Sequence, residues 1–132
     1  MKLRRMLPGK RKREAKGQVF AIDMSDDNDH PRCQATDFLS KRPPADKKTI
    51  LNAMRQFETA GELKNEKVLR PLEPRDRGIW EFKCKGVTRL ACFYERPDLI
   101  IVTHGFPKSN NRDTARQRDH AISIRDQWHK RR

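Results

Sequence analysis

Alternating apolar and polar residues in the C-terminal half of the chain predict three consecutive strands. The strands are residues 78–85 (GIWEFKCK), 87–95 (VTRLACFYE) and 98–105 (DLIIVTHG). In the first of them Trp80, Phe82 and Cys84 fall on one face, because successive side chains of a strand point to opposite sides. Turn residues separate the three runs, so we expect an antiparallel meander.

The first half of the chain predicts helices and one earlier strand. In residues 45–61, apolar side chains recur at helical spacing and Gly61 stands where a helix would end. The other predicted elements are a strand in residues 17–24, a short helix in 35–40, a charged connection in 62–77 and a helix from about residue 111.

This order predicts an α+β domain. We expect a small, mostly antiparallel twisted sheet, made of one early strand and the three-strand C-terminal meander. Two helices would cover one face of this sheet, and the C-terminal helix would follow.

The register of the hairpin in residues 78–95 follows from its pattern. A loop of Lys85, Gly86 and Val87 would place Phe82 opposite Leu90 and Trp80 opposite Cys92. A slip of one residue would mix apolar and charged side chains on both faces. The pattern therefore predicts an apolar face against helices and an exposed opposite face carrying Glu81, Lys83, Arg89, Ala91 and Phe93.

Charge is concentrated at the two ends of the chain. The 132 residues carry a net charge of +13, and 37% of them are charged. Residues 1–17 hold eight Lys or Arg against one Glu, and residues 108–132 hold eight against three Asp. We expect residues 1–17 to be a flexible basic extension and residues 18–132 to form one domain. The basic ends either add affinity for RNA phosphates or are solvated tails.

Apolar runs, cysteines and possible metal ligands indicate where the protein works and what it binds. The sequence shows neither a signal peptide nor an apolar run long enough for a membrane span, and its three cysteines lack disulfide spacing. We therefore expect a cytoplasmic protein with no membrane partner. His30 and Cys33 resemble half of a metal site, but no second pair has suitable spacing. We expect no metal and no small-molecule cofactor.

The exposed sheet face and the end of the last strand offer groups that suit RNA chemistry. Lys83, Arg89 and Lys108 would bind phosphate and stabilise charge that develops on it. His104 would move the proton of a 2′-hydroxyl. Other expected RNA contacts are Lys85, Arg112, Phe93 and Tyr94, the two aromatic rings by stacking on bases. A charged outer sheet face is also the ordinary condition of a two-layer domain.

The segment GIWEFKCKGVTRLACFY followed by DLIIVTHGFPKSN resembles the C-terminal half of RelE-type toxins, in particular the phage-related HigB-like branch. Members typically show a strand of the form (L/I)WE(L/F)R, a hairpin, and a later strand ending in HGFxKK. Residues 79–83, Arg89 to Tyr94 and His104 to Lys108 take these places. The resemblance covers roughly residues 18–115.

This resemblance implies the toxin of a type II toxin–antitoxin pair, with a cognate antitoxin as partner. Relatives bind the ribosome, including its 16S rRNA, and cleave mRNA in the A site without a metal. The implied roles are a phosphate clamp for Arg89 and charge stabilisation and proton transfer for Lys108 and His104. Lys83 takes the position of the basic residue of the first strand, and Tyr94 would stack or orient a base.

The sequence departs from the family pattern at Thr88, where an aromatic residue often stands, and at Ser109, which replaces the second lysine of HGFxKK. Two alternatives therefore stay open. One is a non-enzymatic, ParE-like poison of DNA gyrase on the same fold. The other is an inactive prophage-derived module that binds RNA.

Overall fold

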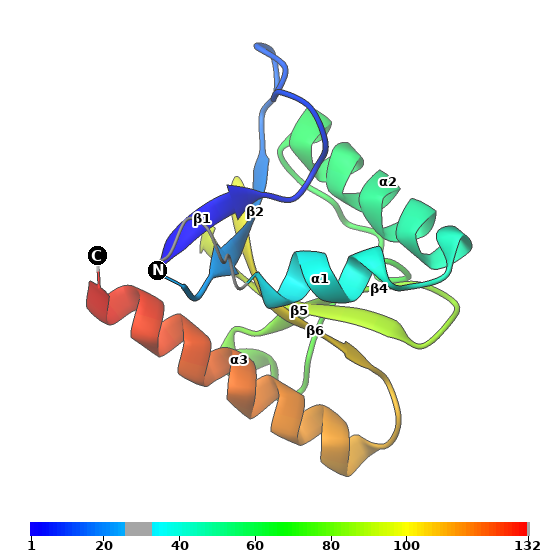
Figure 1. Ribbon diagram of the computed structural model, residues 1–132, viewed down its shortest axis with the longest axis vertical. Coiled ribbons are helices and arrows are strands. Elements are labelled where there is room, and N and C mark those ends of the chain that lie inside the picture. Colours follow the sequence, from blue (N-terminus) through cyan, green and yellow to red (C-terminus); the bar gives the residue numbers. More distant parts are fainter. Residues whose placement is uncertain (26–32, 132) are drawn as a thin grey trace.

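One six-stranded sheet organises the computed structural model, which describes residues 1–25 and 33–131 (Figure 1). Its spatial order is β1–β2–β6–β5–β4–β3. The strands are β1 (Lys2–Arg5), β2 (Gln18–Asp23), β3 (Leu69–Pro71), β4 (Trp80–Lys83), β5 (Thr88–Arg96) and β6 (Leu99–Pro107). All neighbours pair antiparallel except β2 and β6, which are parallel. The predicted α+β class and the C-terminal meander are confirmed.

Three α-helices and one 3-10 turn accompany the sheet. They are α1 (Gln34–Ser40), α2 (Pro44–Ala60), η1 (Arg75–Arg77) and α3 (Asn111–Arg131). Pro44 occupies the first turn of α2, where its missing N–H costs nothing, and Gly61 ends this helix in the left-handed conformation at φ 76°. The helix predicted in residues 45–61 is confirmed.

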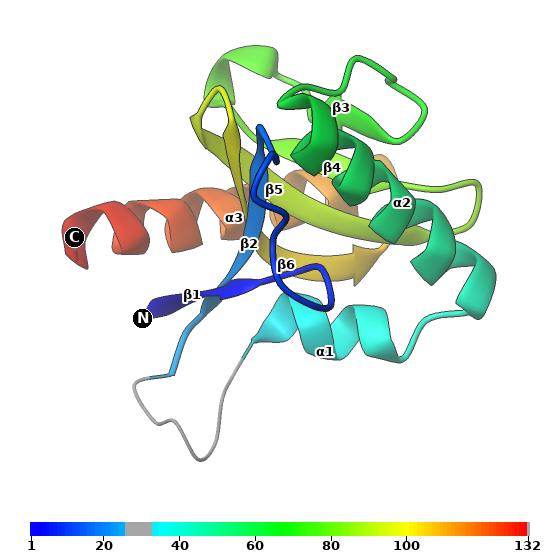
Figure 2. The same ribbon diagram turned by 90° about the horizontal axis from the view of Figure 1, so that it is seen from above.

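Helices cover both faces of the sheet, and not one face as the sequence predicted (Figure 2). α1 and α2 pack on the face that carries Phe82, Leu90 and Cys92. α3 packs through Ala121 and Ile124 on the other face. Apolar residues on that second face explain why it is covered, since α3 removes them from water. They are Ile22, Leu72, Ile79, Ala91, Phe93, Ile101 and Phe106.

The hairpin of β4 and β5 has the predicted register. Phe82 pairs with Leu90 and Trp80 with Cys92, and Lys83 lies opposite Arg89. The following strand has an irregularity: Ala91 pairs with His104, but Cys92 pairs with Val102. Thr103 is therefore an extra residue, a bulge that moves His104 to the face covered by α3.

The N-terminal segment is ordered at its start, which differs from the flexible extension that we expected for residues 1–17. Residues Lys2–Arg5 pair with β2 as an edge strand, and Met6 and Leu7 are buried. Arg5 also forms a two-pronged pair with Glu58 of α2, at 2.5 and 2.9 Å. The local sequence has no periodic signal for a strand, because its few apolar residues stand among charged ones. Hydrogen bonds with β2 and the contact with α2 stabilise this strand instead. β3 was likewise missed in the charged connection of residues 62–77.

Gly105 is required by the close approach of α1 to β6. A Cβ atom added at Gly105 would lie 2.1 Å from Cδ1 of Phe38 and 2.9 Å from Leu90. The Gly105→Ala substitution should therefore lower the free energy of unfolding by about 1–3 kcal/mol through overpacking. Urea denaturation of Gly105→Ala, Phe38→Ala and the double variant measures this effect. We expect a smaller cost of Gly105→Ala in the Phe38→Ala background, and equal costs in both backgrounds would contradict the contact.

Candidate functional site

Strand pairing brings three of the predicted cationic residues to one end of the sheet. Lys83 of β4 lies opposite Arg89 of β5, and Arg89 lies opposite Phe106 of β6. Two residues later, the backbone N–H of Lys108 donates to the carbonyl oxygen of Val87 at 2.7 Å, which fixes the chain beyond β6 to the hairpin loop. The pKa of Lys83 is lowered, first by burial and then by the positive charges of Arg70, Arg89 and Lys108.

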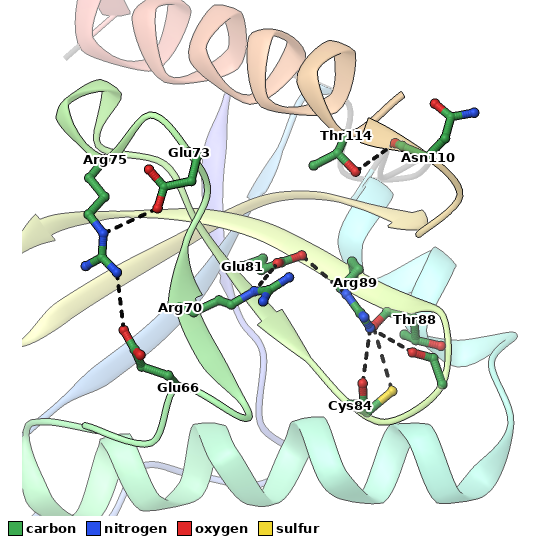
Figure 3. A network of polar contacts seen from close by, with 11 residues as sticks. Glu66, Arg70, Glu73, Arg75, Glu81, Cys84, Thr88, Arg89, Asn110 and Thr114 are labelled. Carbon is green, nitrogen blue, oxygen red and sulfur yellow. Dashed lines mark hydrogen bonds and ion pairs between the residues drawn. The ribbon is translucent and has the colours of Figure 1, made fainter. Parts of the chain in front are cut away.

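Glu81 is the centre of this cluster. Its side chain is 2% exposed and lies between two arginines (Figure 3). Oε2 of Glu81 accepts a hydrogen bond from Nε of Arg70 at 2.8 Å, and Oε1 lies 3.3 Å from Nε of Arg89. One carboxylate thus neutralises only part of the positive charge that Arg70, Lys83, Arg89 and Lys108 bring to this end of the sheet.

Arg89 is held by the loop that it adjoins. Its Nη1 donates to the carbonyl oxygens of Cys84, Gly86 and Thr88, at 3.2, 2.8 and 2.9 Å. Its buried Nε lies near Glu81 but has no hydrogen-bond acceptor among the described residues. Arg89 therefore fixes the turn between β4 and β5, and one donor remains on the side of Glu81 (Figure 3).

Thr88 supports the same loop from the other face of the sheet. Its hydroxyl donates to Oδ2 of Asp46 at 2.6 Å and accepts from Nε of Arg42 at 2.9 Å. The Asp46 carboxylate also lies against Gly86, where an added Cβ would come within 2.9 Å of it. The Thr88 hydroxyl thus joins the hairpin to the first turn of α2.

A cleft of about 400 Å³ opens beside the cluster, between β3 and β4 on one side and the first turns of α3 on the other. Glu81, Arg70 and Lys108 line it together with Thr114, Arg75 and Arg118. Nη1 of Arg118 donates a 2.7 Å hydrogen bond to the carbonyl oxygen of Glu73. Arg75 lies between the carboxylates of Glu66 and Glu73, at 3.6 and 3.4 Å (Figure 3). The cleft is therefore lined by four cations and three carboxylates: Arg70, Arg75, Lys108 and Arg118, with Glu66, Glu73 and Glu81.

The structure does not place His104 at this cleft. Its ring is 3% exposed, its Nε2 lies 2.9 Å from Oε1 of Gln117 on α3, and its Nδ1 lies 3.0 Å from the Thr103 hydroxyl. The pKa of His104 is lowered to about 4, mainly by burial; the hydrogen bond with Gln117 raises it, and the charge of the neighbouring His120 lowers it. This burial does not favour His104 as the group that transfers a proton to or from RNA, because α3 covers the ring.

The two aromatic rings predicted to stack on bases, those of Phe93 and Tyr94, pack against other rings within the protein. Phe93 is 2% exposed beneath α3, with its ring 5.7 Å from that of His129. Tyr94 is half-buried on the opposite face of the sheet, edge-on to Phe57 and Trp80. Neither ring lines the cleft. Base stacking by these residues stays a prediction, and the burial of Phe93 does not favour it.

Of the remaining predicted contacts, Lys85 is exposed in the hairpin loop and Arg112 is exposed in the first turn of α3. Sequence reasoning missed Arg70 and Arg118, although both line the cleft. Arg70 lies in a three-residue strand, and Arg118 lies in a helix with many charges, so neither had a local signal. His30, the other half of the considered metal pair, lies outside the described residues.

Comparison with known protein families gives one match. Residues 37–126, more than half of the chain, match the family described as phage derived protein Gp49-like (DUF891). The chain belongs to the Gp49-like family. This is a RelE-like toxin family in general, and the α+β fold of this Gp49-like protein is compatible with the RelE fold. No curated protein matches the chain significantly.

In residues 1–25 and 33–131, none of the helices is both long and apolar enough to cross a membrane. The same residues contain no group of three or more His, Cys, Asp or Glu side chains that could hold a metal ion.

Arg70 and Arg89 should differ sharply in their contribution to stability, although both contact Glu81. Arg89→Ala removes a guanidinium that is 6% exposed and leaves Glu81 and three carbonyl groups short of donors, so we expect a loss of about 3–5 kcal/mol. Arg70→Ala removes a side chain that is 40% exposed, and we expect a loss of about 1 kcal/mol. Denaturant unfolding of both variants measures the difference.

Arg89→Lys provides the control, because it keeps the charge but lacks the forked donors. We expect it to recover little of the loss. Similar stabilities for Arg70→Ala and Arg89→Ala would contradict the structural role of Arg89.

The burial of His104 predicts a dependence of stability on pH. The unfolded chain gains a proton on this histidine below its ordinary pKa of 6.5, whereas the folded protein resists protonation until about pH 4. Stability from this group is therefore full above about pH 6.5 and falls as the pH is lowered towards 4, by roughly 3 kcal/mol in all. The free energy of unfolding, measured at neutral pH and near pH 4.5, should fall less steeply for His104→Gln than for the wild type. Parallel curves would contradict this origin.

Proposed function

We propose that this Gp49-like protein is the toxin of a type II toxin–antitoxin pair and that it cleaves mRNA in the ribosomal A site. One observation carries the proposal: Arg70, Lys83, Arg89 and Lys108 gather around the buried Glu81 beside an open cleft. Such an excess of positive charge suits a phosphodiester, whose transition state gains negative charge.

The proposed reaction uses the 2′-hydroxyl of the RNA as nucleophile. Lys83 takes the hydroxyl proton, which its lowered pKa favours because a larger fraction of the amine is then neutral. The 2′-oxygen forms a bond to the adjacent phosphorus while the bond to the 5′-oxygen breaks. The leaving 5′-oxygen takes a proton from water, the protonated Lys83 returns its proton to the resulting hydroxide, and a 2′,3′-cyclic phosphate remains on the other fragment.

The other cations have supporting parts in this proposal. Lys108 and Arg70 line the cleft and would stabilise the charge on the phosphoryl oxygens. Arg89 is a positioning residue that holds the loop, while Glu81 orients Arg70 and Arg89. Lys85 and Arg112 would bind neighbouring phosphates from the hairpin loop and from α3, and the antitoxin would cover this surface.

Burial of Arg89 and His104 is the observation that favours a second candidate, a module that binds RNA without cleaving it. Such a protein would keep the cationic cleft but lack transition-state stabilisation. The two candidates differ in one result, cleavage of mRNA on the ribosome.

Cleavage of mRNA on programmed 70S ribosomes is the test. We expect cuts at the A-site codon that require the ribosome, with naked mRNA left intact. Lys108→Ala should reduce the rate roughly 100-fold, because it removes a charge that acts on the developing anion. Lys48→Ala is the matched control, since Lys48 is an exposed lysine on α2.

A folded wild-type protein that leaves mRNA intact would refute the nuclease. If this protein then blocked supercoiling by DNA gyrase, the gyrase-poison function would replace the nuclease function. Equal rates for Lys108→Ala and the wild type would refute the site. Arg89→Ala is a poor choice here, because its structural role confounds the result.

A further inference from the structure

A strongly basic loop joins β1 to β2 and projects beyond the sheet (Figure 1). Its sequence in residues 10–16 is KRKREAK, with five cations and one anion. Residues 8–14 are all exposed, and the attachment to the domain lies on either side of them. The loop lies outside residues 37–126, which match the Gp49-like family, so the family match does not explain it.

The base of this loop is firmly attached to the domain. Met6 and Leu7 are buried in the core below it, and the backbone N–H groups of Lys16 and Gly17 both donate to the carbonyl oxygen of Glu58 at 2.9 Å. Arg11 closes the loop from within, because its guanidinium donates to the carbonyl oxygens of Gly17 and Ala15 at 3.1 and 2.9 Å. These contacts hold the base of the loop against the domain.

The charges at the tip are not neutralised within the protein. Lys10, Lys12 and Arg13 are exposed, and their side chains have no ion-pair or hydrogen-bond partner in the part of the chain that the structure describes. Arg11 binds only carbonyl groups, so its charge also persists. Adjacent like charges repel one another, and this arrangement becomes favourable when an external polyanion neutralises them.

The loop and the cleft face different parts of the molecule. The loop is attached to the end of α2, which covers one face of the sheet, whereas α3 lines the cleft on the other face. In the sheet, β6 and β5 separate β2 from β4. A ligand that contacts both must therefore be an extended, folded polyanion, because a short strand in the cleft would not reach the loop.

We propose that residues 10–16 form a second RNA-contact surface, which binds the phosphate backbone of folded ribosomal RNA apart from the mRNA in the cleft. Lysine and arginine side chains on an exposed loop recognise phosphate by charge and without reading bases. The choice of the ribosome as partner rests on the proposed function, but the contact itself requires no cleavage.

Binding to empty 70S ribosomes at several salt concentrations tests the proposal, since ribosomes without mRNA separate binding from cleavage. The loop variant is Lys10→Gln, Lys12→Gln, Arg13→Gln. The matched control changes three exposed lysines elsewhere, Lys41→Gln, Lys48→Gln, Lys130→Gln. A short single-stranded oligoribonucleotide serves as the probe for the cleft. Thermal unfolding should give equal Tm values for the loop variant and the wild type, because the three side chains have no internal contacts.

We expect the loop variant to bind ribosomes at least about tenfold more weakly at moderate salt, and its slope of log K against log salt to be shallower by about 2. The control variant should change much less, and the affinity for the oligoribonucleotide should be the same in all three proteins. If the wild type does not cleave mRNA but the three proteins still differ in ribosome binding in this way, the nuclease activity is refuted and the second RNA-contact surface is supported.

Two results would overturn the proposal. One is an equal loss of ribosome affinity in the loop and control variants, which would show a general effect of net charge. The other is unchanged ribosome binding together with a loss of binding to vesicles that contain phosphatidylglycerol, which would assign the loop to an anionic membrane surface.

Discussion

Glu81 is a carboxylate removed from water, and its burial depends on the two arginines beside it. An unpaired buried charge would be very costly, so Arg70 and Arg89 must stay close to the carboxylate. Through this requirement Glu81 joins three strands: Arg70 comes from β3, Glu81 from β4 and Arg89 from β5. Arg89 extends the connection into the hairpin loop through its three carbonyl acceptors, and this loop in turn receives the backbone N–H of Lys108. The arrangement of the cationic cleft therefore follows from one buried ionic group.

The second constraint is that both faces of the sheet are apolar near the centre. A sheet of this kind needs a cover on each side, and α3 supplies the second one. This cover creates the cleft, because the first turns of α3 form one of its walls and contribute Arg118. It also removes His104 and Phe93 from solvent. The same packing step that builds the candidate site thus decides which of the polar and aromatic residues of β5 and β6 can take part in it.

Charge is divided between two places with different physical character. At the cleft, Arg70 and Arg75 are paired with carboxylates, and the pKa of the neighbouring Lys83 is lowered by burial and by nearby positive charges. Such an environment suits chemistry on a single phosphate. In the loop of residues 10–16, cations are exposed and unpaired, and they would contribute affinity in proportion to the phosphates that they neutralise. This contrast fits a protein that holds a large RNA in one place and acts on it in another.

The sequence by itself determined the elements with strong periodicity. The helix that ends at Gly61 and the pairing of Phe82 with Leu90 followed from apolar spacing and turn residues, because these signals are local. Lys83, Arg89 and Lys108 were also predicted to lie together. Tertiary structure alone decided the rest. The bulge at Thr103 turned His104 towards α3, and short strands such as β1 and β3 formed because neighbours offered hydrogen bonds. The exposure and the partners of a side chain depend on residues far away in the chain. A local sequence pattern therefore does not predict them.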